Sequence, residues 1–228
     1  GFIRLKTQKL TLLFDEKTDL KPQNSEEFMC SAFSFEMTSG DIPFMQNNTS
    51  FSCYFGKSDE ILFLDNQMNT LGINIQEKNS NEALFKSKVK EVRQYRDLRN
   101  NYIEGEKEIS FNEISLSYNR KLQLSFTGKK ILGKERISLN QTSKKDYFFY
   151  LPFYFHPDVE IWKSDNFGNF LLKIKNNEIW RFETDKNVFL ENYKFLDPLD
   201  LEIKNGKRII LFSNFDQEEQ FLNWKLYL

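Results

Sequence analysis

Hydrophobic and polar residues alternate along most of the chain, and a period of two residues is typical of β-strands that bury one face. Near the start, Leu10, Leu12 and Phe14 would face one side of such a strand. The alternation returns later, with inward positions at Phe33, Phe35 and Met37; at Leu122, Leu124 and Phe126; at Phe170, Leu172 and Ile174; and at Leu222, Trp224, Leu226 and Leu228. The pattern therefore predicts many half-buried strands.

Short polar segments between these stretches predict tight turns. Asn205-Gly206 is the strongest two-residue hairpin signal in the chain, and Asn119-Arg120 and Asn176-Asn177 occupy the same place in two other predicted hairpins. Ser39-Gly40-Asp41 follows the stretch that contains Phe35 and predicts a further turn. Strands that are joined by short turns pair with their neighbours in antiparallel order.

Helical periodicity is weak in comparison. The best segment runs from Asn81 to Val92 and is rich in charged residues, so we expect a loop or one short helix there. No Gly/Ser-rich or Pro-rich linker divides the sequence. The sequence predicts a single all-β domain over residues 1–228, with little helix. Its expected architecture is a large antiparallel, supersandwich-like two-layer β-sandwich whose sheets bury their apolar sides against each other.

Charge and composition limit the possible partners. The 228 residues contain 32 Lys and Arg against 33 Asp and Glu, so the net charge of −1 does not provide the basic surface that nucleic-acid binding requires. No apolar run approaches the roughly 20 residues of a membrane-spanning helix. No signal peptide is visible at the N-terminus, so the compartment stays undecided.

Little in the sequence supports a metal, a cofactor or a nucleophilic triad. His156 is the single histidine, and Cys30 and Cys53 lack the CxxC partners of a zinc site. The glycine-rich motifs that bind nucleotide phosphates are absent, as is a nucleophile elbow. We therefore expect no metal and no cofactor.

Two local clusters invite a functional interpretation. Residues 147–159 gather seven Tyr and Phe residues before His156; they could form a sugar-stacking or acid/base surface, but a central strand buried on both faces, with His156 hydrogen-bonded inside, is the favoured interpretation. Lys129-Lys130 precedes Lys134, Glu135 and Arg136, which could bind an acidic polymer. A solvated hairpin edge is the favoured interpretation of this second cluster, because edge strands carry lysine to deter pairing.

Several segments together resemble a known family. Gly1–Leu5 looks like an entry strand, Ala32–Gly40 like an "LSFEFSSG" strand, and Asn119–Leu122 with Gly133 and Arg136 like an "RRLYL" stretch. Phe155-His156-Pro157-Asp158-Val159 followed by Glu178–Phe182 is similar to an "LHPDV…GWRF" pair. In this order and spacing, from about residue 1 to 215, they resemble the C-terminal β-sandwich domain of the heparinase II/III-like polysaccharide lyases.

The resemblance implies an upstream (α/α) toroid, as a domain or a subunit, that packs against the sandwich. It also implies an acidic polysaccharide as the partner, cleaved by β-elimination of uronic-acid units in the cleft between the two domains. Such chemistry needs a group that neutralises the uronate carboxylate, a base and an acid. In the family much of this machinery belongs to the toroid, which these 228 residues do not include. A cell-envelope or periplasmic location would accompany the family.

Candidate site residues follow from the same resemblance. His156 matches the family's His-Pro-Asp-Val position, and Asn69 stands where the family usually carries a histidine, although an amide cannot act as a base near neutral pH. Tyr154, Arg136 and Arg181 are the candidate substrate-binding residues. Two hypotheses stay open: the sandwich portion of a lyase that is inactive without its helical domain, and a stand-alone, non-catalytic carbohydrate-binding or assembly module. A structural β protein without a sugar ligand is a third.

Overall fold

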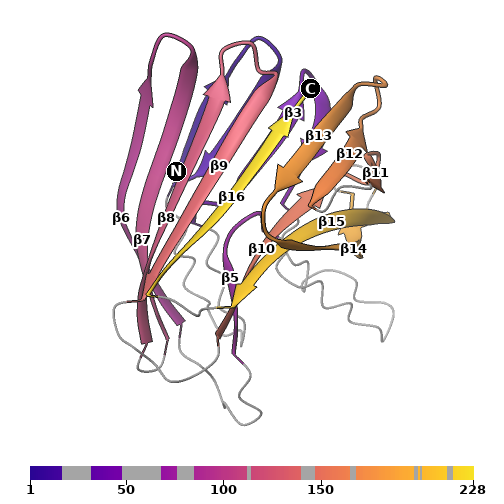
Figure 1. Cartoon of the computed structure of the whole chain (residues 1–228). Helices are drawn as coiled ribbons and strands as arrows, with labels where there is room; N and C mark the ends of the chain where they lie inside the picture. Colours follow the sequence, from indigo (N-terminus) through magenta and orange to yellow (C-terminus); the bar gives the residue numbers. More distant parts are fainter. Residues whose placement is uncertain are drawn as a thin grey trace.

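The computed structural model describes residues 1–16, 32–47, 68–75, 85–111, 114–139, 147–164, 168–197, 200, 202–214 and 218–228, which form two eight-stranded sheets and no helix. The sheets face each other as the two layers of a sandwich (Figure 1). All strand pairs that the structure describes are antiparallel. The predicted fold class is therefore confirmed.

The first sheet runs in the order β1-β2-β3-β4-β10-β15-β14, and β5 pairs separately with β10. Its strands are β1 (Phe2–Lys6), β2 (Leu10–Asp15), β3 (Phe35–Ser39), β4 (Ile42–Met45), β5 (Gly72–Ile75), β10 (Tyr147–Phe155), β14 (Asn187–Leu196) and β15 (Ile203–Asn214). Strand β10 is central, as the aromatic cluster predicted: Phe149, Leu151, Phe153 and Phe155 are buried on its inner side, and Pro152 and Tyr154 are buried on its outer side.

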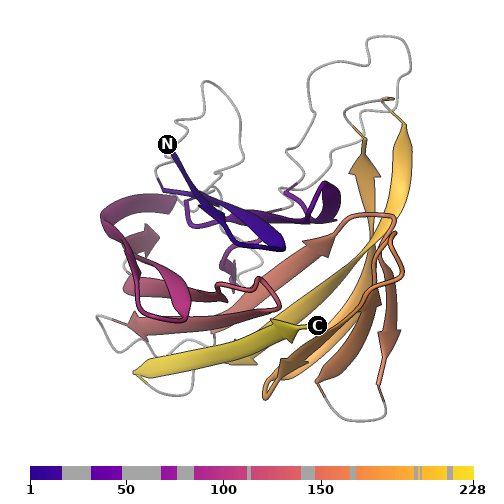
Figure 2. The ribbon, with the colours of Figure 1, turned by 90° about the horizontal axis from the view of Figure 1, so that it is seen from above.

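The second sheet runs in the order β11-β12-β13-β16-β9-β8-β7-β6. Its strands are β6 (Phe85–Arg96), β7 (Asn100–Phe111), β8 (Ile114–Ser125), β9 (Lys130–Leu139), β11 (Glu160–Lys163), β12 (Asn169–Lys173), β13 (Ile179–Thr184) and β16 (Glu219–Tyr227). After β13, the chain leaves this sheet and enters β14 of the first sheet. Figure 2 shows how the segments before and after this transfer, in orange, lie close together at one side of the sandwich.

The alternating apolar positions of both sheets meet in one buried cluster. Trp224 lies at its centre, with its ring stacked on Phe35 at 5.9 Å and edge-to-face with Phe153 at 4.9 Å between ring centroids. Gly133 on the neighbouring strand makes room for this ring, because a Cβ at that position would lie 1.9 Å from it. Large aromatic side chains from both layers therefore supply much of the apolar burial that stabilises the fold.

A charged network lies inside this apolar core. The guanidinium of Arg120 donates from Nε to both oxygens of Glu135, at 3.1 and 2.9 Å, and both side chains are completely buried. Glu135 also accepts hydrogen bonds from the Tyr118 hydroxyl at 2.6 Å and from Trp224 Nε1 at 3.0 Å. Burial raises the pKa of Tyr118 well above its ordinary value, so this hydroxyl keeps its proton and donates.

Arg120 also joins the two layers. Its Nη1 atom donates to the backbone carbonyls of Phe33, at 2.6 Å, and of Asn69, at 2.5 Å, in segments that flank strands of the first sheet. Lys107 of the second sheet donates from Nζ to Ala32 O at 2.7 Å and lies over the rings of Phe33 and Tyr118. These buried cations help to satisfy buried backbone carbonyls, and the Thr70 hydroxyl also donates to Ala32 O at 3.2 Å.

Some local predictions are confirmed and others are wrong. Turns form at Gly40 and Asn177, which have φ angles of 59° and 66°. Asn119-Arg120 and Asn205-Gly206 make no turns, because β8 and β15 continue through them. Within the predicted loop or helix from Asn81 to Val92, residues from Phe85 onward form strand β6, and residues 81–84 lie outside the described residues, as do Cys30 and Cys53.

The run from Lys129 to Arg136 is not a sheet edge. Strand β9 lies between β8 and β16, and within it Glu135 points into the core while Lys134 and Arg136 point to solvent. Lys130 and Lys134 therefore lie on the outer face of a central strand, and Lys129 lies in the connection that precedes this strand. Among the described residues, no helix is long and apolar enough to cross a membrane.

Candidate functional site

Asn69 lies where the first sheet is held together by a side chain as well as by strand pairing. Strands β4 and β10 pair at one position, Phe155 with Met45. Beside that position, the fully buried amide of Asn69 accepts a hydrogen bond from the backbone N–H of Tyr154 at 2.6 Å and donates to Phe35 O at 2.9 Å. The amide thus bridges β10 and β3, and both of its functional atoms are used in that bridge.

Tyr154 follows this bridge on the outer face of β10, where it is 2% exposed. Its hydroxyl accepts a hydrogen bond from Arg208 Nη1 at 2.7 Å, across the β10–β15 pair. Arg208 in turn donates to one carboxylate oxygen of Glu191 on β14, at 3.1 Å from Nε and 2.8 Å from Nη2. A partly exposed cation is therefore held directly above the tyrosine hydroxyl.

Two further aromatic side chains complete this outer surface. The ring of Tyr193 meets that of Tyr154 edge-on at 5.0 Å, and its hydroxyl donates to Phe155 O at 2.6 Å. Burial raises the pKa of Tyr193 above the ordinary range of a phenol, so it stays a neutral donor. Phe195 packs with both tyrosines as a small cluster of its own. We call Asn69, Tyr154, Tyr193, Phe195 and Arg208 the outer tyrosine cluster.

His156 lies at the rim of the outer tyrosine cluster, directly after β10. Its ring contacts Phe195 edge-on at 5.5 Å, and its side chain is 12% exposed. The Nδ1 atom accepts a hydrogen bond from the backbone N–H of Asp158 at 3.2 Å, so that nitrogen carries no proton. Burial lowers the pKa of His156 below its ordinary value of 6.5, and the nearby Asp158 and Asp197 carboxylates only partly oppose this effect.

The lowered pKa of His156 predicts a pH effect on stability. The unfolded chain takes up a proton at this imidazole near pH 6.5, whereas the folded chain resists protonation to lower pH. Stability should therefore be complete above pH 6.5 and fall as the pH drops below that value, until the folded form is protonated too. Urea titrations across this interval should show a shallower pH dependence for His156→Gln than for the wild type, and equal slopes would contradict the assignment.

Arg136 and Arg181, the other two candidate substrate-binding residues, lie on the outer face of the second sheet, away from Tyr154. Arg136 is exposed and forms an ion pair with Glu219. Arg181 is also exposed. Their partner positions on β16 are Phe221 and Tyr227, six residues and hence roughly 20 Å apart along a strand. The structure therefore brings Asn69, Tyr154 and His156 together and leaves the two arginines separate from them and from each other.

Sequence reasoning missed Arg208 and Tyr193. Tyr193 on β14 and Arg208 on β15 both point to the outer face of the first sheet. Their contact with Tyr154 depends on the register between β10, β14 and β15, which the sequence does not disclose. The available signal was weak, since Arg208 appears in the sequence only as a charged residue between Lys207 and Ile209. In the part of the chain that the structure describes, no three His, Cys, Asp or Glu residues gather as metal ligands.

Chemically, the outer tyrosine cluster combines a guanidinium with tyrosine hydroxyl groups, and its amide at Asn69 cannot act as a general base. Asn69 has both functional atoms engaged in backbone contacts, and an amide does not take up protons near neutral pH. The imidazole of His156 uses one nitrogen to accept a backbone hydrogen bond. Arg208 is the cation of the cluster, with a side chain that is 27% exposed and a guanidinium that already pairs with Glu191 and donates to Tyr154.

Comparison with known proteins matches the chain to one family. The model of the heparinase II/III-like C-terminal domain matches residues 1–225. No curated protein sequence matches the chain significantly.

Solved structures share the fold at low sequence identity. The heparan sulfate lyase HepC from Pedobacter heparinus superposes with a TM-score of 0.71 at 10% identity, over 100% of this chain and 35% of that one. A heparinase III structure gives a TM-score of 0.65 at 12% identity, over 99% of this chain and 34% of that one. A 4-alpha-glucanotransferase from Thermococcus litoralis gives 0.61 at 11% identity, over 100% and 37%. The chain thus spans about a third of the length of the structures it matches.

Proposed function

Because the chain belongs to the heparinase II/III-like family as its C-terminal β-sandwich domain, we propose that it forms one wall of a cleft in which an acidic polysaccharide is cleaved by β-elimination. The other wall is a helical domain or subunit. The outer tyrosine cluster faces the cleft and binds the uronate, while proton transfer is supplied by the helical part.

The observation that carries this proposal is the family match over residues 1–225, combined with the chemistry of Asn69. In elimination, the C5–H bond and the C4–O bond break, a C4–C5 double bond forms, a base takes the C5 proton and an acid protonates the leaving oxygen. Arg208 is the cation that would contact the uronate, in exchange for or beside its pairing with Glu191, and the position of the family histidine holds Asn69, whose amide makes two backbone hydrogen bonds. This division of labour explains why a helical partner is required.

Two further facts support the proposal. The heparan sulfate lyase and heparinase III structures are about three times as long as this chain, so most of each lies outside the shared fold. The outer face of the first sheet also exposes apolar side chains beside the cluster: Phe189, 53% exposed, stacks on Phe212, and Tyr150 is 38% exposed. Such exposed aromatic groups suit a surface that another domain covers.

A direct test compares elimination by the chain with that by a longer polypeptide that includes the helical domain. Heparan sulfate is the first substrate, and the ultraviolet absorbance of the unsaturated uronate product is the readout. The chain alone should form no product, and the longer polypeptide should form it. In the longer polypeptide, Arg208→Met should lower kcat/KM by about a hundredfold, as expected when one charge-stabilising group is lost, whereas Arg93→Met, an exposed arginine of β6, should leave it unchanged.

Product formation by the chain alone would overturn the division of labour. Absence of product from the longer polypeptide on any uronic-acid polysaccharide would overturn the lyase proposal. A second candidate would then stand: a non-catalytic carbohydrate-binding or assembly module. This candidate is favoured by the full engagement of Asn69 in backbone hydrogen bonds and by the hydrogen bond from the backbone N–H of Asp158 that occupies Nδ1 of His156. It requires saccharide binding without elimination.

A further inference from the structure

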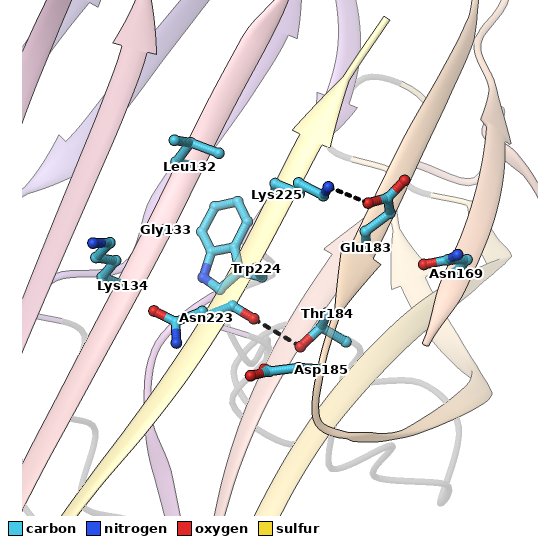
Figure 3. A pocket seen from close by; sticks show the side chains of 10 residues that line it. All are labelled: Leu132, Gly133, Lys134, Asn169, Glu183, Thr184, Asp185, Asn223, Trp224 and Lys225. Atoms are coloured by element: carbon cyan, nitrogen blue, oxygen red, sulfur yellow. Dashed lines mark hydrogen bonds and ion pairs between the residues drawn. The ribbon is translucent and has the colours of Figure 1, made fainter. Parts of the chain in front are cut away.

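A groove of about 530 Å³ opens on the second sheet, away from the outer tyrosine cluster. Figure 3 shows it at β9, β16 and β13, with Lys134 and Asn223 on one side and Glu183, Asp185 and Asn169 on the other. Leu132 and the backbone around Gly133 and Trp224 also line it. A volume of this size lies within the range of small-molecule and saccharide sites, about 300–1,000 Å³.

The groove forms where strand β13 stops pairing with strand β16. Strand β13 pairs with β16 from Arg181 opposite Tyr227 to Thr184 opposite Trp224, and the chain then passes into β14 of the other sheet. The edge of β16 before Trp224 consequently loses its neighbour. The Thr184 hydroxyl donates to Asn223 O at 2.8 Å and covers the first carbonyl that is left open.

Hydrogen-bonding groups gather in the groove without being used by the fold. Of the described residues, none makes a hydrogen bond or ion pair to the side chains of Lys134, Asn169, Asp185 or Asn223. Lys225 and Glu183, in contrast, form an ion pair across the groove. Two amides, a carboxylate and an ammonium are therefore open to a ligand that carries several hydroxyl groups.

The charge of Lys134 determines which end of the groove favours an anionic group of the ligand. Lys134 on β9 lies directly opposite Lys121 on β8, with both side chains on the outer face, and like charges in this arrangement repel each other. Lys121 is compensated by Glu104 at 4.0 Å and by the rings of Tyr95 and Tyr102 at 5.5 and 5.4 Å. Lys134 has no such compensation from a described residue, so an anionic group at this end of the groove would relieve the repulsion.

We propose that this groove binds an acidic oligosaccharide, with a carboxylate or sulfate at Lys134 and hydroxyl groups at Asn223, Asn169 and Asp185. Asp185 and Glu183 repel a second anionic group at the end of the groove opposite Lys134. The ligand therefore binds in one orientation, with its anionic group at Lys134. The choice of an acidic saccharide rests on the proposed function. The domain then contacts polysaccharide on two opposite faces, and this groove holds a segment other than the one at the outer tyrosine cluster.

The test uses isothermal titration of the full chain with a heparan sulfate hexasaccharide, with Lys134→Glu as the probe. Loss of one charge-assisted contact should weaken binding about tenfold or more. The matched control is Lys130→Glu, which makes the same charge change on the same strand and face, about 13 Å away and outside the groove. This control should bind within about twofold of the wild type, because only specific contacts distinguish the two positions. Thermal unfolding of both variants establishes that they fold.

Three results would contradict saccharide binding in this groove. The first is an equal loss of affinity in both variants, which indicates a diffuse charged surface. The others are an unchanged affinity of Lys134→Glu, and binding of a neutral maltohexaose as tight as that of the heparan sulfate hexasaccharide. Failure here is distinct from failure of the proposed function. If the longer polypeptide still forms the unsaturated product and this activity depends on Arg208, the proposed function is supported and only the proposal for the groove is rejected. If the longer polypeptide forms no unsaturated product, the function falls, whatever the groove binds.

Discussion

Replacing Arg120 by Met should lower the free energy of unfolding by about 3–5 kcal/mol, the usual cost of removing one partner of a buried ion pair. The substitution leaves the carboxylate of Glu135 buried, with only the hydrogen bonds from Tyr118 and Trp224 to stabilise its charge. It also removes the donor from the carbonyls of Phe33 and Asn69, which belong to the opposite layer. The expected loss of stability therefore has two sources, the unpaired buried charge of Glu135 and two carbonyls without hydrogen-bond donors.

Urea unfolding of Arg120→Met and of two comparison proteins checks this expectation. Arg93→Met makes the same substitution in an ion pair whose side chains are 65% and 52% exposed, and should leave the urea midpoint of unfolding nearly unchanged because solvent screens the pair. The double variant Arg120→Met with Glu135→Gln should recover part of the loss, because it removes the uncompensated charge. Equal stability of the Arg120 and Arg93 variants would show that the buried pair contributes nothing.

Asn69→Ala should destabilise the fold by about 2–6 kcal/mol, since it leaves two buried backbone groups without partners at about 1–3 kcal/mol each. These groups are the N–H of Tyr154 and the carbonyl of Phe35. They lie on β10 and β3, so the substitution removes a bridge between the two halves of the first sheet. The loss should appear in chemical unfolding, with Asn192→Ala as a control.

Asn192 is a suitable control because it is an exposed asparagine of β14. Its replacement should change stability by less than about 0.5 kcal/mol. The comparison also tests the role of Asn69, because a residue that acts only on a substrate could be truncated without a stability cost. If Asn69→Ala unfolds at the wild-type urea concentration, the bridge is not important and a functional role for the amide regains support.

The strands of this fold could be read from the sequence because burial repeats with a period of two. Leu12, Phe35, Leu172 and Leu226 are buried as the alternation predicts. Leu228 departs from it, since it lies just beyond β16 and is 41% exposed. Many strands joined by short turns extended this local prediction to a two-layer sandwich, and the family resemblance implied the same architecture.

Turns were predicted less well, because a pair of turn-forming residues can have a packing role inside a strand. Gly206 lies opposite Tyr193, and a Cβ there would come within 2.4 Å of the tyrosine ring. The glycine therefore makes room for an aromatic side chain rather than reversing the chain. Arg120 was assigned to a turn because it follows Asn119 between two alternating apolar stretches, and its buried partner Glu135 is distant in sequence.

The candidate site was predicted in part for the same reason. Asn69, Tyr154 and His156 could be selected from local motifs, and the structure places them together. Arg136 and Arg181 were selected from segments that resemble the family, but the side of the sandwich on which each lies depends on strand order. Arg208 was missed because its importance comes from cross-strand contacts with Tyr154 and Glu191.

The position of β16 has a consequence for how the protein folds. This strand, the last in the sequence, is inserted between β9 and β13, just as β10 is inserted between β4 and β15. Contact order is therefore high, and folding should take milliseconds to seconds rather than microseconds. During synthesis, the second sheet remains open until residues after 218 emerge, with β9 and β13 exposed as unpaired edges. A nascent or prematurely terminated chain would be prone to self-association through those edges.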